Sequence, residues 1–171
     1  MLTELSHRRL RQLRRIVCHN RAALLACSQR REWDYCVVTA SSRRQASLYR
    51  HELAARQQRG QFAATTRLLA VPDPPGFRPG SGGGALWALR AVARQVARKS
   101  AKGLKAQDAA AILARRRIVI IQSGGESRRA PLHTAGGKLF ARLPSVLGDG
   151  RSSTVLDDLW ALLRPLAAAL D

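Results

Sequence analysis

Apolar residues recur along the chain at two different spacings, which predict strands and helices in alternation. Short runs of consecutive apolar residues, typical of buried strands, occupy positions 36–39, 68–71 and 118–121. Apolar residues at helical spacing fill the flanking and intervening segments, at 2–30, 42–60, 85–89, 109–114 and from about 154. Strands that are apolar throughout and separated by helices indicate a mostly parallel sheet with helices on both faces. The predicted fold class is therefore α/β.

Polar residues at two of the predicted helix starts support these boundaries. The spacing of a capping box, in which Ser or Thr is followed three residues later by a polar or acidic partner, occurs at Ser42/Gln45 and Thr154/Asp157. We expect residues 1–30 to form an amphipathic helical segment and residues 31–171 to form the α/β part of the chain. After the last predicted strand, the sequence predicts a long loop to Pro144 and then a last helix from about Thr154.

The composition is strongly basic, but the basic residues are scattered. The 171 residues carry a formal charge of +19, and 26 of the 30 basic residues are arginine, spread from Arg8 to Arg164. Aromatic residues make up only 5% of the chain and are not interleaved with the arginines as a platform for base stacking. This pattern favours solvated helix faces. A non-catalytic, Arg-rich nucleic-acid-binding or interaction protein on an α/β scaffold is the alternative reading of the charge.

Three further features of the sequence bear on the cellular compartment of the protein. The longest aliphatic run, Ile118 to Ile121, is far shorter than the roughly 18 apolar residues of a membrane span. The first residues contain no apolar signal region. The three cysteines, an odd number without a C-x-x-C pair, predict neither a disulfide framework nor a zinc site (Cys18, Cys27 and Cys36). These observations predict a cytoplasmic protein with no membrane partner.

Two glycine-rich segments follow predicted strands, where ligands bind in parallel α/β sheets. The first, 80–84, is read as a loop that runs into a helix and formally fits G-x-G-x-x-A. A proline-rich stretch separates it from its strand, so a flexible glycine linker is the alternative. The second starts at Ser123, directly after the strongest strand, and contains glycines, two arginines and Lys138. Backbone amides, a guanidinium and an ammonium suit a triphosphate.

The second segment resembles the signature of the sugar-1-phosphate nucleotidyltransferases, G-x-G-x-R-x-x-P-x-x-x-x-x-x-K. Arg128 lies three residues before Pro131 and Lys138 lies seven after it, as in that signature. More narrowly, residues 30–160 resemble the pyrophosphorylase domain of the L-fucokinase / fucose-1-phosphate guanylyltransferase family. Four landmarks carry this resemblance: WDYCVVTA (33–40), VPDPPG (71–76), GSGGGAL (80–86) and RIVIIQSGGESRRAPLHTAGGKLFARLP (117–144).

The resemblance implies a Rossmann-like, GT-A-like fold and transfer of a nucleotidyl group, with GTP as the donor and L-fucose 1-phosphate as the acceptor. An oxygen of the sugar phosphate would attack the α-phosphorus and pyrophosphate would leave. Arg128 would stabilise the leaving pyrophosphate, with Arg129 as the alternative, and Lys138 would stabilise charge on the transferred phosphoryl group. Residues that would bind the nucleotide are Gly82, Gly83, Gly84, Gly124, Gly125 and Ser127.

The resemblance also implies Mg²⁺ and further sequence. Enzymes of this family are longer, and their metal-binding carboxylates come from later strands, so no metal ligand is assigned in this chain; neither Asp73 nor Glu126 alone makes a ligand set. We expect the chain to be a truncated, N-terminal part of such a domain. It would supply the nucleotide-binding part, and a missing C-terminal portion or a separate kinase or sugar-binding chain would supply the rest.

Overall fold

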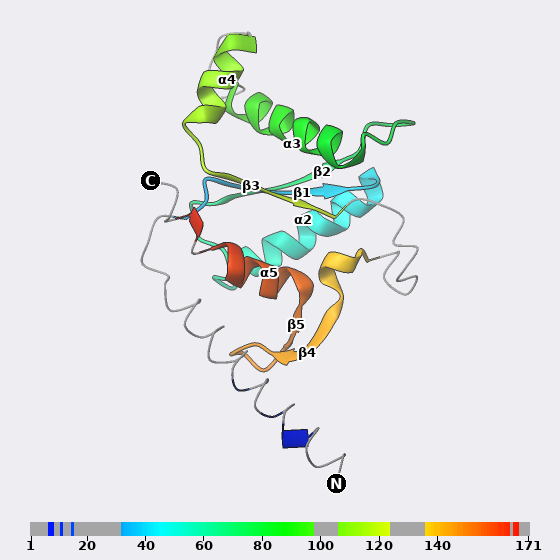
Figure 1. The fold of residues 1–171 in the computed structure, drawn as a ribbon, viewed down its shortest axis with the longest axis vertical. Coiled ribbons are helices and arrows are strands. Elements are labelled where there is room, and N and C mark those ends of the chain that lie inside the picture. Colours follow the sequence, from blue (N-terminus) through cyan, green and yellow to red (C-terminus); the bar gives the residue numbers. More distant parts are fainter. Residues whose placement is uncertain are drawn as a thin grey trace. The chain divides into compact units, whose positions relative to one another are not determined.

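The computed structural model describes residues 7, 8, 11, 15, 32–97, 106–123, 136–164 and 166–167. The chain divides into two compact units, of which the larger is 32–142 and the smaller combines 1–31 with 143–171 (Figure 1). Four residues within the predicted N-terminal segment 1–30 are described, and they are helical; the rest of that prediction lies outside the described residues.

A three-stranded parallel sheet forms the centre of the larger unit. Its strands are β1 (Tyr35–Ala40), β2 (Arg67–Pro72) and β3 (Ile118–Gln122), in the order β2-β1-β3. Every residue of β1 is buried because the strand has a neighbour on each side. The three predicted strands are confirmed to within two residues at each end, and so is the α/β class.

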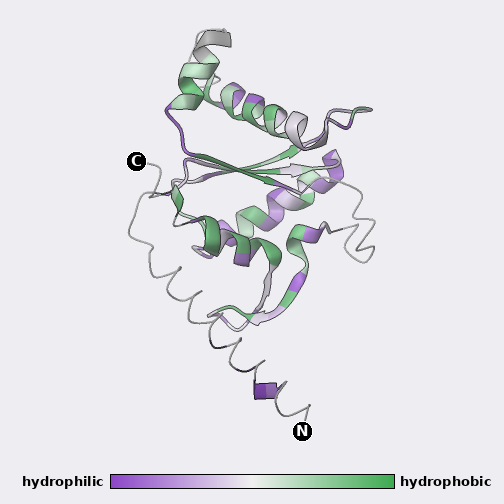
Figure 2. Ribbon diagram, in the orientation of Figure 1, coloured by the Kyte–Doolittle hydropathy of each residue, from purple (hydrophilic) through white to green (hydrophobic). Residues whose placement is uncertain are grey.

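Helices cover both faces of this sheet. On one side lies α2 (Arg43–Gln58), and on the other lie α3 (Gly80–Ala97) and the shorter α4 (Ala106–Ala114) (Figure 1). Apolar side chains of β1 and β2 pack against α3 in a core of Tyr35, Val37, Val71, Ala88 and Val92. The strands are accordingly hydrophobic, and polar residues gather on the outer sides of the helices (Figure 2). No helix in the described parts of the chain is long and apolar enough to cross a membrane.

The start of α2 shows the predicted Ser42/Gln45 pairing in a modified form. The Ser42 hydroxyl accepts a hydrogen bond from the Gln45 backbone N–H (3.1 Å). The Gln45 side chain, however, accepts from the backbone N–H of Ser41 (2.8 Å) and from its hydroxyl (3.0 Å), one residue before the cap. Two donors at the end of β1 are thereby satisfied, which fixes the connection between β1 and α2.

Replacing the cap tests this connection. We expect Ser42→Ala to lower the free energy of unfolding by about 1 kcal/mol, because the Gln45 N–H loses its acceptor. Ser47→Ala, within the same helix, serves as the control, and its effect is expected to stay within about 0.5 kcal/mol. Urea unfolding followed by circular dichroism measures both values. Equal effects of the two substitutions would show that Ser42 stabilises nothing as a cap.

The structure corrects the prediction for the first glycine-rich segment. Gly80–Gly84 is not a loop before the helix, because α3 already begins at Gly80. Gly80 has a φ of 65° and so adopts a conformation that favours glycine. A Cβ at Gly83 would lie 2.7 Å from the Cβ of Pro79, and Gly84 is buried. Close packing and a turned backbone therefore explain these glycines, and a flexible linker does not.

A strand pair that the sequence did not predict lies in the smaller unit, apart from Arg142 at its start. Strands β4 (Arg142–Val146) and β5 (Ser152–Thr154) form a two-stranded sheet, joined by a tight turn in which Gly150 N–H donates to the Leu147 carbonyl (3.0 Å). Little in the sequence indicates β4, since this short strand contains Pro144. The helix α5 (Val155–Leu163) follows, and the predicted capping box of Thr154 and Asp157 is confirmed.

Candidate functional site at the carboxyl ends of the strands

The carboxyl ends of the strands place the first glycine-rich segment next to the end of β3, where the second segment starts. The parallel strands end at Ala40, Pro72 and Gln122, and α3 begins beside that edge. A hydrogen bond links β3 to the first segment, because the Gln122 side-chain amide donates to the Ser81 carbonyl in the first turn of α3 (2.7 Å). The end of β3 therefore lies against the glycine-containing start of a helix.

The first turn of α3 offers backbone donors at this edge. The first four N–H groups of a helix have no partner within the helix, and the helix dipole favours negative charge there. No acidic side chain occupies this first turn. Gly82 faces open space, whereas Gly83 and Gly84 are half-buried and buried. Of the three predicted glycines, Gly82 is thus the one whose backbone a ligand could approach most closely.

Ser123, the residue after β3, is held by two other elements. Its hydroxyl shares a buried hydrogen bond with the Tyr49 hydroxyl of α2 (3.0 Å). Its backbone N–H donates to the Thr39 hydroxyl in β1 (3.1 Å). Burial raises the pKa of the Tyr49 phenol, and the bond to Ser123 offsets part of that rise. The starting point of the signature segment is therefore fixed from both the sheet and α2.

The same tyrosine also contacts the far end of the segment. Gly137 packs so closely on Tyr49 that a Cβ at Gly137 would lie 1.9 Å from the phenolic oxygen. Phe140, three residues on, packs on the Tyr49 ring with centroids 5.0 Å apart, and the Arg56 guanidinium lies 4.9 Å from the centroid of the Phe140 ring. We call Tyr49, Ser123 and Gly137 the Tyr49 bracket. The bracket holds both flanks of the segment 124–135 on one side chain.

Lys138 directly follows the bracket. It is the first residue of η2 (Lys138–Phe140), a short 3₁₀ helix, and its side chain is exposed. The structure thus attaches Lys138 to the same edge of the sheet as Ser123 and the start of α3. The other predicted residues of the signature segment lie outside the described residues: Gly124, Gly125, Ser127, Arg128 and Arg129.

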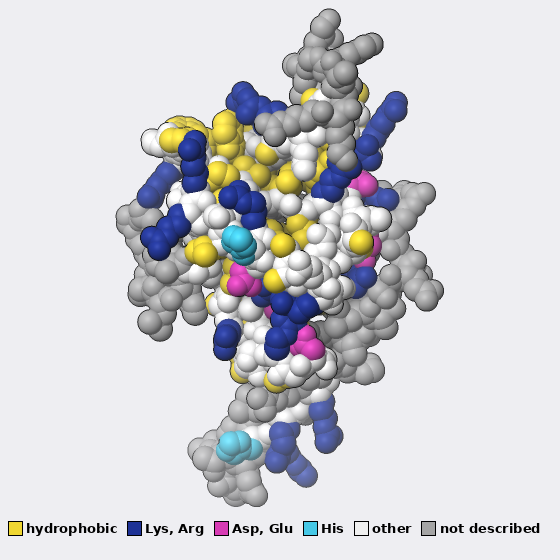
Figure 3. All heavy atoms as spheres, turned by 180° about the vertical axis from the view of Figure 1, so that it is seen from behind, with side chains coloured by type: hydrophobic (Ala, Val, Ile, Leu, Met, Phe, Trp, Pro, Cys, Tyr) yellow, Lys and Arg dark blue, Asp and Glu magenta, His cyan; other side chains and the backbone are white. Residues whose placement is uncertain are grey.

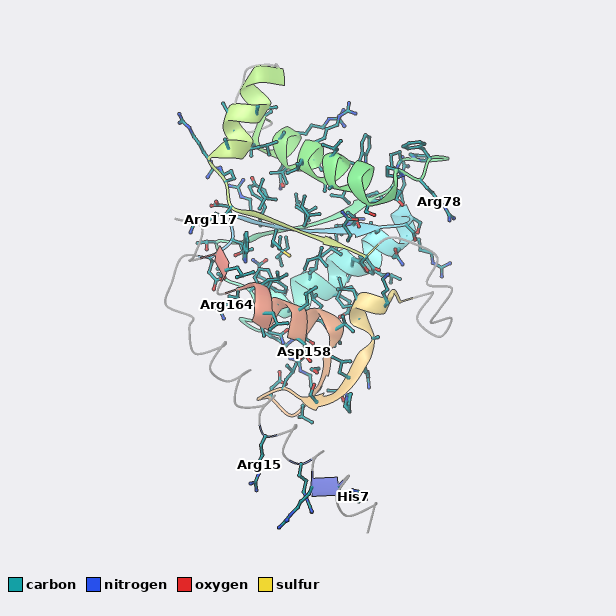
Figure 4. All side chains as sticks on the ribbon, in the orientation of Figure 1. His7, Arg15, Arg78, Arg117, Asp158 and Arg164 are labelled. Carbon is teal, nitrogen blue, oxygen red and sulfur yellow. The ribbon has the colours of Figure 1, made fainter. Side chains whose placement is uncertain are left out.

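Two oppositely charged residues, Asp73 and Arg78, lie beside this edge, in the connection from β2 to α3. The sequence did not predict this pair. Partial burial raises the pKa of the Asp73 carboxyl, and the positive charge of Arg78 acts in the opposite direction. Figure 4 places Arg78 at the end of the sheet where α3 begins, whereas Arg117 lies at the opposite end, before β3. Among the parts of the chain that the structure describes, no group of three His, Cys, Asp or Glu residues could hold a metal ion.

Sequence reasoning missed Tyr49 and Thr39 as parts of this site. Tyr49 reads as an ordinary apolar residue of an amphipathic helix, and Thr39 as a strand residue. The one available signal is weak: each is a hydroxyl-bearing side chain in an otherwise apolar, buried face. Their partner Ser123 lies more than seventy residues away in the chain, so no local pattern links them.

Over about two thirds of its length, the chain is similar to known pyrophosphorylases and guanylyltransferases. It is 34% identical over 130 residues, 68% of the chain, to the bifunctional fucokinase/GDP-fucose pyrophosphorylase of Arabidopsis thaliana. It is 29% identical over 112 residues, 66% of the chain, to the fucose-1-phosphate guanylyltransferases of Mus musculus and Homo sapiens. The chain is a homologue of part of these fucose-1-phosphate guanylyltransferases and fucokinase/pyrophosphorylases, and the resemblance read from the motifs is confirmed.

The similarity covers only a small part of each relative. The matched segment spans 12% of the Arabidopsis protein, 17% of the mouse protein and 16% of the human protein. No protein-family model matches the chain, and no solved structure matches it.

Proposed function

We propose that this chain supplies the nucleotide-binding part of a fucose-1-phosphate guanylyltransferase. The observation that carries the proposal is the Tyr49 bracket, which holds both flanks of the signature segment at the carboxyl edge of a parallel sheet, next to the first turn of α3. The names of the homologues support GTP as the nucleotide and L-fucose 1-phosphate as the acceptor.

In this proposal, the chain binds and neutralises phosphate groups. Backbone N–H groups in the first turn of α3, at Gly82 above all, donate to phosphate oxygens of GTP. The Lys138 ammonium stabilises negative charge on the transferred phosphoryl group, and Arg128 stabilises the leaving pyrophosphate. The sugar phosphate oxygen attacks the α-phosphorus, the bond from that phosphorus to the bridging oxygen breaks, and GDP-fucose and pyrophosphate form.

Two components of the reaction are left to other groups. Mg²⁺ would neutralise phosphate charge when bound, but the described residues include no set of ligands for it, so we assign it no position here. The sugar phosphate would be held by further sequence or by a separate chain, because the chain matches only a small part of its relatives.

Removing the Lys138 charge tests the proposal. We expect Lys138→Ala to weaken GTP binding by about 10- to 100-fold, the loss of a hydrogen bond to a charged group, while thermal unfolding stays unchanged because the side chain is exposed. Arg142→Ala is the matched control, since it removes the same charge from an exposed position four residues away. Calorimetric titration with GTP and Mg²⁺ measures the affinities.

Several results would contradict the proposed function. Unchanged GTP affinity in Lys138→Ala would remove the lysine from the site. Equal losses in Lys138→Ala and Arg142→Ala would show non-specific attraction by a basic chain. Tight RNA binding with a steep salt dependence, and no GTP binding by the folded protein, would favour the nucleic-acid alternative. If GTP does bind, mixing the chain with fucose 1-phosphate and following pyrophosphate release tests transfer.

A further inference from the structure

A cavity lies along the outer edge of β2 and reaches the carboxyl end of that strand at Pro72 and Asp73. It has a volume of about 570 Å³, within the range of small-molecule sites. Its floor is formed by apolar residues of β2 and the proline-rich connection after it, and its walls are formed by α2 and α3. Neither the glycines of α3, nor Ser123, nor Lys138 lines it. It therefore adjoins the carboxyl edge at Asp73 but contains none of the residues to which the proposed function assigns nucleotide binding.

Four arginines from the two helices line this cavity. Arg43 and Arg50 are seven residues apart in α2, and Arg90 and Arg94 are four apart in α3, spacings that place each pair on one side of its helix. Since α2 and α3 cover opposite faces of the sheet (Figure 1), the arginines that line the cavity come from helices on both sides of β2. Figure 3, seen from behind, shows dark blue basic side chains around a yellow apolar area.

These arginines are not neutralised by the protein. The acidic residue of α2, Glu52, pairs with Arg56, and α3 contains no acidic residue. Within the described residues, none of the four arginines of the cavity forms an ion pair. The one carboxyl in the lining is Asp73, which is influenced by Arg78. The cavity therefore carries a net positive charge of several units that a ligand could balance.

The edge of β2 does not suit an added strand. The N–H groups of Arg67 and Asp73 donate toward β1. Backbone groups of successive residues in a strand point to opposite sides, so every second residue between them, up to Pro72, directs its backbone groups away from β1. Pro72 has no N–H, and its carbonyl already accepts the indole N–H of Trp87 (3.1 Å). This combination closes the carboxyl half of the edge. A compact ligand fits the cavity better than an extended peptide.

We propose that this cavity binds a nucleoside di- or triphosphate at a second site, separate from the one that the proposed function requires. A phosphate monoester carries about −1.5 to −2 charge at neutral pH, so two or more phosphates are needed to balance four guanidiniums, which bind phosphate bidentately. The floor of Leu69, Val71 and proline rings, with the Trp87 indole in the wall, would be left uncovered by phosphate alone and suits the nucleoside.

Calorimetric titration with GTP tests the second site. We expect wild-type protein to bind two GTP molecules per chain. Arg50→Ala/Arg94→Ala is expected to weaken one of the two sites at least tenfold, and Lys138→Ala to weaken the other. Arg44→Ala/Arg115→Ala is the matched control, because it removes two exposed charges that do not line the cavity, and it is expected to leave both sites unchanged.

The outcomes separate the two proposals. One bound GTP that is lost in Arg50→Ala/Arg94→Ala but kept in Lys138→Ala supports the cavity and contradicts the proposed function. One bound GTP with the reverse behaviour overturns the cavity proposal. The proposal also fails if the control variant loses as much affinity, if inorganic pyrophosphate binds the cavity as tightly as GTP, or if a short single-stranded RNA binds there more tightly than GTP.

Discussion

Gly137→Ala is expected to destabilise the larger unit strongly and to abolish GTP binding at the carboxyl edge. A Cβ at this position would lie 1.9 Å from the phenolic oxygen of Tyr49 and 2.7 and 2.9 Å from two ring carbons, which all belong to a buried side chain that cannot move aside. The φ of 76° adds backbone strain. Overpacking and strain each cost about 1–3 kcal/mol, so the free energy of unfolding should fall by about 2–6 kcal/mol.

The measurement for Gly137→Ala is thermal unfolding, with GTP titration beside it. A melting temperature lower by roughly 10 °C is expected for a protein of this size. Gly136→Ala is the matched control, because its Cβ would meet nothing within 4 Å and its φ is not positive. If Gly137→Ala behaves like Gly136→Ala, then Gly137 does not pack on Tyr49 and the bracket is wrong.

Tyr49→Ala is expected to lower the free energy of unfolding by about 3–5 kcal/mol, the usual loss for a buried aromatic side chain. The tyrosine is fully buried and contacts Ser123, Gly137 and Phe140. Tyr49→Phe removes only the hydroxyl and should cost about 1 kcal/mol. Leu48→Ala, at the neighbouring exposed position, is the control and should change the stability by less than about 0.5 kcal/mol. Urea unfolding measures all three.

The pH dependence gives a second readout for Tyr49. Its pKa in the folded protein is raised by burial above the ordinary value of 10.0, so the folded state keeps the proton at a pH where the unfolded state loses it. The stability linked to Tyr49 is therefore complete below pH 10 and declines as the pH rises through the raised pKa. The difference in stability between wild type and Tyr49→Phe should shrink over that range. A pH-independent difference would contradict a buried phenol.

Combining the two substitutions separates packing from strain. In a Tyr49→Ala background, Gly137→Ala no longer meets the phenol, so its remaining cost should be the backbone strain of about 1–3 kcal/mol. Strict additivity of the two losses would show that the residues do not interact.

The strands of the larger unit were well predicted from the sequence, because their residue patterns fit a buried strand and few other structures. Runs such as Ile118–Ile121 are apolar at every position, and a five-residue element between helices with no polar face is typical of a buried parallel strand. The predicted start of α3 was wrong. The prediction placed it after the glycines, because glycine has a low helix propensity. Local propensity was overridden there by packing, since Gly83 fits against Pro79 where a larger residue does not.

The sequence predicts which residue types belong to the candidate site, but it does not predict how they are arranged in space. The signature spacing predicts Lys138 as a site residue, and its role stays a prediction. What holds the segment in place is Tyr49, whose partners Ser123 and Gly137 lie far along the chain, and only the folded α2 brings them together. The four arginines of the cavity were read as solvated helix faces, because nothing in the sequence indicates that α2 and α3 flank the same sheet edge.

The strand order has a consequence for how the protein is made. During synthesis the middle strand, β1, leaves the ribosome first, and β2 can pair with one of its edges soon afterwards. The other edge of β1 stays bare until Ile118–Gln122 has been translated, because β3 is its second neighbour. For that interval the nascent chain exposes a mostly apolar strand with unpaired backbone groups, the kind of surface that chaperones shield and that aggregates otherwise. The yield of folded protein should thus depend on conditions during translation more than its final stability suggests.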